Sequence, residues 1–222
     1  MTELRLIAGT ALVEAPEEVE APTPLRLPPG RHGIPADLVR AHQRLRLLEA
    51  AADALAEQGY GRVTAARVTE LAGVSSRTFY QHFEDLWACL LAAYENEAGL
   101  LYQEIESACE RAQSQDRGDR ARVGIAAALG FLASQPSAAR LLSAEPPPQI
   151  TALAAARRDL VERLGAMLRS VLEPGGATPL PGLERRLVGA ALALVAARSA
   201  SGDPQRLRRL EPELSDLLLA SL

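Results

Sequence analysis

Residues 64–83 read TAARVTELAGVSSRTFYQHF, and this stretch decides the fold. Thr64 is of a type that caps helix N-termini, and the helix it starts stops at Gly73, which can adopt the positive φ of a tight turn. A second helix begins at Ser75 or Ser76 and runs nearly to the end of the stretch. Two short helices joined by a tight turn predict a helix-turn-helix, whose second helix places its N-terminal residues in the major groove of DNA.

The side chains of this motif divide into a buried set and an exposed set. We expect the apolar members to pack the two helices together and onto the preceding helix: Val68, Leu71, Val74 and Phe79. The exposed polar members of the second helix are Ser76, Arg77, Thr78 and Gln81. Arginine, glutamine and hydroxyl side chains are the types that hydrogen-bond to base edges. Thr64 could contact a phosphate through its hydroxyl and the free N–H groups of the helix start.

The flanking sequence also favours helices, because Ala, Leu, Arg and Glu dominate it. A helix that follows Pro35 and ends at Gly59 has Asp37 as a plausible N-cap. Its apolar residues recur at helical spacing: Leu38, Leu45, Leu48, Ala52 and Leu55. Proline and glycine punctuate six later helices: one from Glu84 or Asp85 to about Gln113, then 118–134, 136–144, 149–172, 182–200 and 204–221. The predicted fold is therefore all-α, with about nine helices.

Charge and composition narrow the function classes. The net charge of −4 argues against a protein that coats nucleic acid indiscriminately. Residues 31–83 carry seven Arg and five acids, net +2, whereas the segments on either side are each net −3. The two cysteines, Cys89 and Cys109, are too few for a disulfide framework, and no signal peptide or membrane span is recognisable. We therefore expect a cytoplasmic protein without a membrane partner.

The motif resembles the DNA-binding domain of TetR-type (TetR/AcrR) bacterial transcriptional regulators. The resemblance rests on GY-x-x-V-T…AGVS-x-x-TFY-x-HF, that is on Gly59-Tyr60, Val63-Thr64, Ala72–Ser75 and Thr78–Phe83, and is specific from about Leu45 to Tyr94. It implies that Thr64 and Tyr80 lie on phosphates and that Phe79 and Phe83 are core residues. The predicted DNA-binding set is Thr64, Ser75, Ser76, Arg77, Thr78, Tyr80, Gln81, His82 and, in a flexible arm that could enter a minor groove, Arg31.

The chain departs from the family pattern at two places. Thr69 stands where the family usually has a small residue. Glu84-Asp85 stands where the family often has a lysine, which weakens one expected phosphate contact.

The resemblance also implies a domain organisation. Residues 1–30, rich in proline and glutamate, are expected to be a disordered tail, 31–83 a three-helix DNA-binding domain, and 84–222 a helical bundle for ligand binding and dimerisation. The predicted ligand pocket, for a small apolar effector, comprises Trp87, Leu91, Tyr94, Tyr102 and Phe131. The predicted homodimer interface comprises Leu187, Gly189, Ala190, Ala193, Leu194, Ala197, Leu210, Leu214 and Leu217.

These features predict a ligand-responsive regulator, with repression favoured, that binds a palindromic operator as a homodimer. We expect no cofactor, no metal site and no catalytic residues, because the histidines are scattered and no catalytic motif appears. Two alternatives remain: a family member that has lost DNA binding and serves as an interaction or small-molecule-binding module, and a helical enzyme or scavenging protein that merely carries a similar helix pair. Activation in place of repression also stays open.

Overall fold

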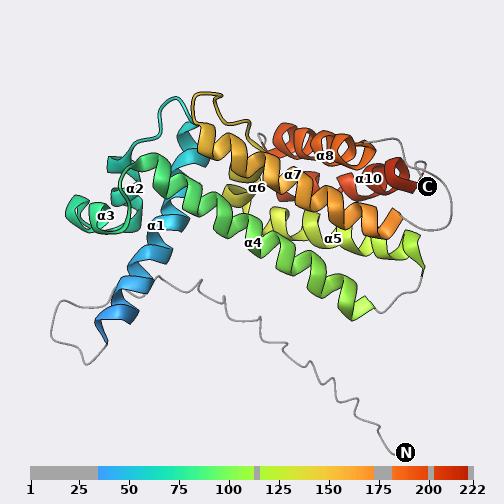
Figure 1. Ribbon diagram of the computed structural model, residues 1–222, viewed down its shortest axis with the longest axis horizontal. Coiled ribbons are helices and arrows are strands. Elements are labelled where there is room, and N and C mark those ends of the chain that lie inside the picture. Colours follow the sequence, from blue (N-terminus) through green and yellow to red (C-terminus); the bar gives the residue numbers. More distant parts are fainter. Residues whose placement is uncertain (1–34, 113–115, 173–181, 200–202, 220–222) are drawn as a thin grey trace, which may run out of the picture. The chain divides into compact units, whose positions relative to one another are not determined.

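The computed structural model describes residues 35–112, 116–172, 182–199 and 203–219. The predicted tail over 1–30 and the predicted arm residue Arg31 lie outside these ranges. Every regular element in the described ranges is a helix, which confirms the all-α fold. The helices are α1 (Ala36–Gln58), α2 (Ala65–Ala72), α3 (Ser76–His82), α4 (Leu86–Ala112), α5 (Arg117–Ser134), α6 (Pro136–Ser143), α7 (Thr151–Leu172), α8 (Leu183–Ser199), α9 (Pro204–Arg208) and α10 (Leu210–Leu219) (Figure 1).

The segment predicted as one helix over 204–221 forms two helices, α9 and α10, separated at Arg209. Pro212 explains the break. Proline lacks an N–H, and its ring clashes with the carbonyl four residues earlier, so a continuous helix cannot pass through it. In α10 the same proline stands in the first turn, where both features are tolerated.

Helix α1 is only partly a core element. Its buried side chains begin at Leu47, and Leu38 and Leu45 are 59% and 52% exposed, so the prediction that these two leucines join the core is wrong. Pro35 occupies the N-cap position, and the predicted cap, Asp37, lies in the first turn, where a carboxylate still favours the helix dipole. The first turns of α1 therefore extend beyond the packed part of the domain.

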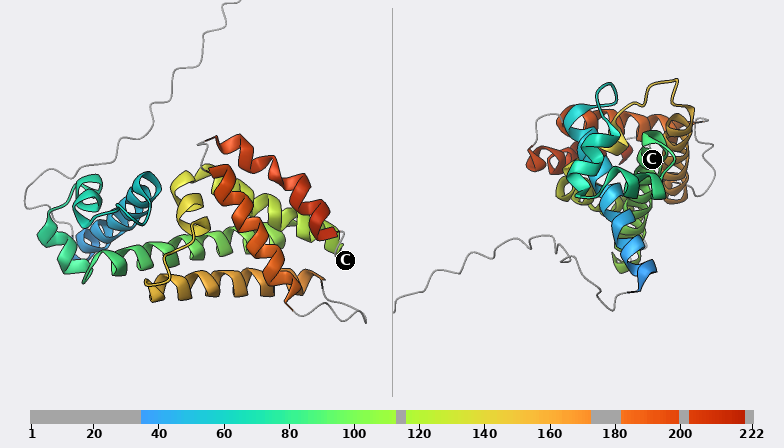
Figure 2. Two further views of the ribbon diagram at one scale, coloured as in Figure 1. Left: turned by 90° about the horizontal axis from the view of Figure 1, so that it is seen from above. Right: turned by 90° about the vertical axis from the view of Figure 1, so that its left-hand side faces the viewer.

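Helix α4 connects the two halves of the described structure. Its N-terminus is capped by Asp85, whose Oδ1 accepts a hydrogen bond from the N–H of Ala88 at 2.7 Å. The first half packs against α1, where the Cys89 thiol faces the carbonyl of Leu47. Further along, α5 and α7 pack against it. Figure 2 shows α1, α2 and α3 gathered around one end of α4 and the remaining helices along the rest of it.

Helix α6 fastens the C-terminal helices to α1 through two polar contacts. The guanidinium of Arg140 donates to the carbonyl of Ala56 at 2.6 Å, and the hydroxyl of Ser137 donates to the carboxylate of Asp53. These contacts join residues 84 positions apart in the sequence, so the helix-turn-helix is held to the body by more than α4. Within the described ranges no single helix is long and apolar enough to cross a membrane; α5 and α6 would satisfy that test only as a pair, and they are bent by 113°.

A buried carboxyl lies on α4 at the junction with α1. Glu97 is 6% exposed, and among the described residues its Oε2 has no hydrogen-bond partner. Burial raises the pKa of Glu97, an amide hydrogen bond from Asn96 opposes this, and the charges of Glu49 and Asp53 raise it further. The charged form is therefore disfavoured by both desolvation and repulsion.

We predict that Glu97→Gln stabilises the protein at neutral pH. Because the folded-state pKa lies above the ordinary value of 4.5, the penalty for burying Glu97 is absent below that pH and grows as the pH rises through the folded-state pKa. The variant should gain on the order of 1 kcal/mol in free energy of unfolding near pH 7 and little near pH 4. Urea unfolding at both pH values measures this, with the exposed Glu95→Gln as a control. An equal effect at both pH values would contradict the prediction.

Candidate nucleic-acid interface and cavity

The turn between α2 and α3 has the conformation that its sequence predicts. Gly73 adopts φ 60° and ψ 38°, the left-handed region that glycine enters without a Cβ clash. Its N–H donates to the carbonyl of Glu70, and the N–H of Val74 donates to the carbonyl of Thr69, both at 3.1 Å. These bonds satisfy the last carbonyls of α2 and redirect the chain into α3.

Both helices of the motif are capped by hydroxyl residues. Thr64 Oγ1 accepts the N–H of Arg67 at 3.2 Å, as the sequence predicts for the first helix. Ser75 Oγ accepts the N–H of Thr78 at 3.1 Å and lies 2.9 Å from Thr78 Oγ1. The caps consume acceptor lone pairs, but each hydroxyl can still donate a proton to an outside acceptor such as a phosphate oxygen.

Two arginines attach α2 to α1. Arg67 forms ion pairs with Glu57 of α1 at 2.8 Å and with Glu70 of its own helix at 3.0 Å. Arg46 of α1 donates to the carbonyl of Ala72 at the end of α2. The start and the end of α2 are therefore both fixed relative to α1.

The predicted packing of the motif is largely confirmed. Val68 and Phe79 are fully buried, Val74 is half-buried, and the rings of Phe79 and Phe83 lie 5.9 Å apart. Leu71 is 37% exposed, so its predicted place between the helices is wrong, because the face of α2 turned to α1 and α3 carries Val68 and Ala72 instead. Thr69, the larger residue noted in the sequence, is buried with its hydroxyl donating to the carbonyl of Ala66 at 2.8 Å. This hydrogen bond satisfies the extra polar group.

The predicted DNA-contacting side chains gather on α3 and at the start of α2. Thr64, Ser75, Ser76, Arg77, Tyr80 and Gln81 are exposed, while Thr78 and His82 are half-buried. Tyr80 is 62% exposed although its ring touches that of Phe79 edge-on, with the centroids 5.2 Å apart. An aromatic ring supported on one side and open on the other leaves its hydroxyl free to reach an external acceptor.

The surroundings of His82 favour its uncharged form. Burial lowers the pKa of His82 below the ordinary 6.5, and the neighbouring charges of Arg40 and Arg44 lower it further. Arg44 also lies over the ring of Phe83, 5.3 Å from its centroid.

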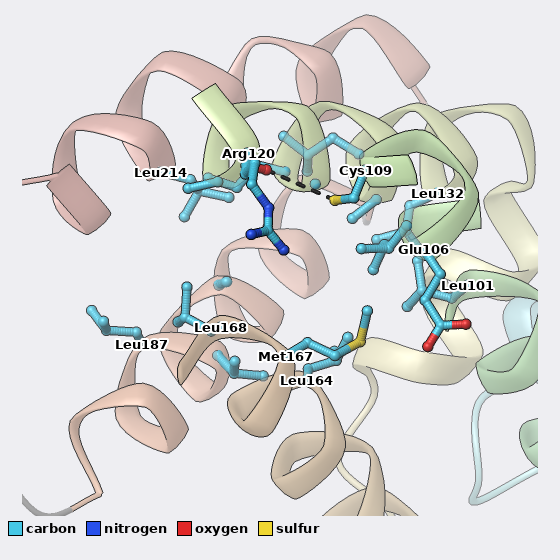
Figure 3. Close-up of a pocket in the computed structure, with 18 of the residues that line it drawn as sticks. Leu101, Glu106, Cys109, Arg120, Leu132, Leu164, Met167, Leu168, Leu187 and Leu214 are labelled. Carbon is cyan, nitrogen blue, oxygen red and sulfur yellow. Dashed lines mark hydrogen bonds between the residues drawn. The ribbon is translucent and has the colours of Figure 1, made fainter. Parts of the chain in front are cut away.

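A cavity of about 440 Å³ lies among α4, α5, α7, α8 and α10 (Figure 3). Its apolar lining residues are Leu101, Ile105, Cys109, Ala121, Gly124, Ile125, Ala128, Leu129, Leu132, Leu164, Met167, Leu168, Leu187, Val188, Ala191, Leu192, Val195, Leu214 and Leu217. Four polar residues join them: Glu106, Glu110, Arg120 and Ser170. Volume and lining are those of a site for a small, mainly apolar ligand.

The five residues predicted to form the pocket do not line this cavity, which is a correction. Tyr94 and Tyr102 are buried in the core, with their hydroxyls donating to the carbonyls of Leu142 at 3.4 Å and Leu160 at 3.3 Å. The remaining three lie elsewhere on the fold: Trp87, 37% exposed; Leu91, half-buried; and Phe131, on a separate hollow. Tyr94 and Tyr102 are structural, because each buried hydroxyl donates to a backbone carbonyl of another helix. Leu101 and Ile105 recur at helical spacing on the same helix, α4, and these two side chains do line the cavity.

The residues predicted for the dimer interface divide into two groups. Ala190, Ala193 and Ala197 form an exposed row on α8, flanked by the half-buried Gly189 and Leu194. The others mostly face inwards: Leu210 and Leu214 are buried within the protomer, and Leu187, Leu214 and Leu217 line the cavity. The prediction that Leu210 and Leu214 lie on the subunit surface is corrected, because α10 packs these leucines against α5 and α9.

In the described part of the chain, no group of three or more His, Cys, Asp or Glu side chains is arranged to hold a metal ion. Cys89 is buried, and burial raises the pKa of its thiol to about 12. Burial also raises the pKa of the half-buried Cys109. Neither thiol is activated as a nucleophile.

The helix-turn-helix geometry has a counterpart among known sequences. Residues 47–93 match the profile of a family described as bacterial regulatory proteins, tetR family. These residues, 47 of the 222 in the chain, span the helix-turn-helix and the start of α4. The match confirms, for this part of the chain, the resemblance seen in the sequence.

Solved structures of TetR-type regulators share the fold of this chain. The fatty acid degradation regulator FadR from Bacillus halodurans has a TM-score of 0.70 at 19% identity, over 81% of this chain and 96% of that one. FadR from Bacillus subtilis, solved in complex with stearoyl-CoA, has a TM-score of 0.64 at 16% identity, over 80% and 98%. A TetR-like regulator from Rhodococcus sp. RHA1 has a TM-score of 0.61 at 17% identity, over 80% and 96%. No curated protein sequence matches this chain.

We predict that Gly73→Ala destabilises this protein by about 1 kcal/mol, because a Cβ is strained at positive φ. Gly99→Ala is the matched control. Gly99 lies inside α4, where an added Cβ meets no atom within 4 Å, so this change should stabilise by a similar amount. Thermal or urea unfolding of both variants measures the two effects. Effects of the same sign would contradict the role assigned to Gly73.

Proposed function

We propose that this protein is a ligand-responsive transcriptional repressor that binds a palindromic operator as a homodimer and releases it when an effector fills the cavity. The observation that carries the proposal is that an exposed helix-turn-helix and an apolar cavity share one long helix, α4. A capped, exposed recognition helix lies at one end of α4, and an apolar cavity lies along the other half. Such a union is suited to making DNA affinity depend on a small molecule.

The DNA side of the proposal depends on α3. Arg77, Ser76 and Gln81 are exposed on this helix, and their side chains can read base edges in the major groove. Thr64 and Tyr80 are also exposed, and we propose that their hydroxyls contact phosphates. The alternative, an interaction module without DNA binding, would leave this row of polar side chains without a partner.

The dimer side depends on α8. Ala190, Ala193 and Ala197 are exposed in one row, and beside them an added Cβ on Gly189 would meet no atom within 4 Å. Small side chains let two helices approach closely, so two copies of α8 can pack across a two-fold axis. A two-fold dimer would present two recognition helices at half-sites roughly 34–36 Å apart, one turn of DNA.

The ligand side depends on the cavity. Its walls are leucine, isoleucine, valine, methionine and alanine from five helices, which favours an alkyl chain over a polar metabolite. The similarity in fold to the Bacillus subtilis FadR that was solved with stearoyl-CoA supports the same class of ligand. We propose an effector with a single alkyl chain.

Two helices couple the cavity to the DNA-binding domain. Helix α4 contributes to both, and α7 lines the cavity with Leu164 while its other end carries Arg157. Arg157 pairs with Glu145 at 2.7 Å, and its charge acts on Tyr60, the residue between α1 and α2 whose pKa burial raises to about 12. A shift of α7 would be felt at Tyr60, whose buried hydroxyl has no partner among the described residues. Effector binding then selects the arrangement with lower DNA affinity.

Selection of bound sequences from random double-stranded DNA tests the proposal. The expected result is a palindromic consensus whose half-site centres are one helical turn apart, with affinity that falls steeply as salt rises. Enrichment of no sequence, together with binding that does not depend on salt, would overturn it in favour of the interaction module.

We predict that Arg77→Ala weakens binding to the selected operator by about tenfold or more, because one base or phosphate contact is lost. Arg158→Ala is the control, since it removes the same charge from an exposed position on α7. Fluorescence anisotropy at fixed salt measures both. Equal losses in the two variants would mean that only net charge matters, against a role for Arg77 in the interface.

We predict that Ala193→Arg converts the dimer to a monomer, because a long charged side chain in a row of small residues prevents close helix approach. The same substitution at the exposed Ala155 of α7 should leave the dimer intact. Light scattering after size exclusion gives both molar masses. A dimeric Ala193→Arg variant would place the interface elsewhere.

A further inference from the structure

We propose that Arg120 is the anchor for the effector's head group, and that the effector is a free single-chain carboxylic acid. Its carboxylate would lie on the Arg120 guanidinium and its alkyl chain among the leucines of α7 and α8. This inference rests on the proposed function, because it specifies the ligand of the same cavity.

Arg120 stands on the first turns of α5, and its side chain enters a space that is lined, apart from Glu106, Glu110 and Ser170, by apolar residues. In Figure 3 its guanidinium points away from α5 into the cavity, towards the side of α7 that carries Met167 and Leu168. On its own helix Ala121, Gly124 and further apolar residues continue the wall. The guanidinium therefore places a positive charge beside an apolar chamber.

Arg120 differs from every other half-buried arginine that the structure describes. Five of these six arginines have a partner for the guanidinium: Arg46, Arg67, Arg140, Arg157 and Arg198. In the same described ranges the guanidinium of Arg120 forms no hydrogen bond, ion pair or ring contact, although its backbone carbonyl faces the Cys109 thiol. A partly desolvated cation without an acceptor is a costly arrangement unless a ligand supplies the acceptor.

A carboxylate is the partner that this geometry favours. A guanidinium offers parallel N–H donors that match the two oxygens of a carboxylate, and charge-assisted pairs of this kind are short and strong. Next to low-polarity walls the pair is less screened than in water. The anion thus gains more at Arg120 than at an exposed arginine such as Arg122.

Two acidic residues argue for a small head group. Glu106 and Glu110 lie on the exposed side of α4 at the edge of the same cavity. Both remain solvated, so they do not need a cationic ligand, but they would repel the several phosphate charges of an acyl-CoA. A free carboxylate carries a single negative charge, which Arg120 would neutralise. We therefore commit to the free acid and treat the thioester as the competing source of an acyl chain.

The volume sets the chain length. At roughly 30 Å³ for a group the size of a water molecule or a methylene, the 440 Å³ cavity holds about 15 such groups. A saturated acid of medium length, such as dodecanoate, fits this space with its head group.

Calorimetric titration of the full chain tests the proposal. The four probes share the same twelve-carbon chain and differ in their head group: dodecanoate, dodecanol, dodecylammonium and dodecanoyl-CoA. Each is used below its critical micelle concentration. We expect dodecanoate to bind tightest. In Arg120→Gln its affinity should fall at least tenfold while that of dodecanol stays unchanged, and Arg120→Lys should recover part of the loss. Arg122→Gln, on the exposed side of the same helix and paired with Asp119, is the matched control and should bind like the unmodified protein.

Three results would overturn the proposal: no binding of dodecanoate, binding of dodecanoate that is indifferent to Arg120→Gln, or tighter binding of dodecylammonium or dodecanoyl-CoA. Unfolding curves show whether each variant is folded, which we expect because Arg120 has no partner to lose among the described residues.

Operator binding without any probe separates this inference from the proposed function. Arg120-dependent binding of dodecanoate by a protein that selects no DNA would support the site and refute the repressor. Operator binding with no response to dodecanoate would support the DNA-binding part alone and refute the site.

Discussion

The packing of α1 against the first half of α4 is the contact on which the rest of the structure depends. Leu47, Ala51 and Ala54 of α1 and Cys89, Leu90 and Ala93 of α4 are fully buried. The side chains at this contact are mostly small, so the two helices lie close and a change of even one methylene would be felt. The helix-turn-helix has little other apolar surface against the body, and its orientation is therefore set by α1.

Polar groups surround this apolar contact and are incompletely satisfied. Glu97, Tyr60 and Arg157 each have a buried atom without a hydrogen-bond partner among the described residues. Such groups make the junction less stable than an entirely apolar one, because each forgoes the hydrogen bonds that water would give. The proposed function requires two arrangements of similar free energy, and a junction of this kind favours a small difference between them. The hydrogen bond from Arg140 to the carbonyl of Ala56 holds α6 on α1.

The cavity and α3 differ in the kind of side chain that they present: α3 presents polar side chains to solvent, and the cavity is lined mainly by apolar ones. On α3 only Phe79 is buried, and the exposed polar side chains are those that the proposed function assigns to DNA. Around the cavity five helices contribute apolar side chains, and the polar exceptions are Glu106, Glu110, Arg120 and Ser170. In the proposed function, selectivity for the effector depends on the cavity volume and on the charge of Arg120. A change of effector would then require changes in cavity residues alone, while α3 stays as it is.

The sequence by itself determined the local structure of the DNA-binding motif. Capping by Thr64, the left-handed Gly73 and the burial of Phe79 all follow from interactions within a few residues, which a short stretch of sequence contains. Only the tertiary structure decided which apolar side chains line the cavity and which fill the core. Tyr94 and Leu101 stand on the same helix at helical spacing, yet one reaches the carbonyl of Leu142 and the other faces the cavity. That outcome depends on α6, α7 and α8, which are distant in the sequence, so the pattern on α4 alone could not separate them.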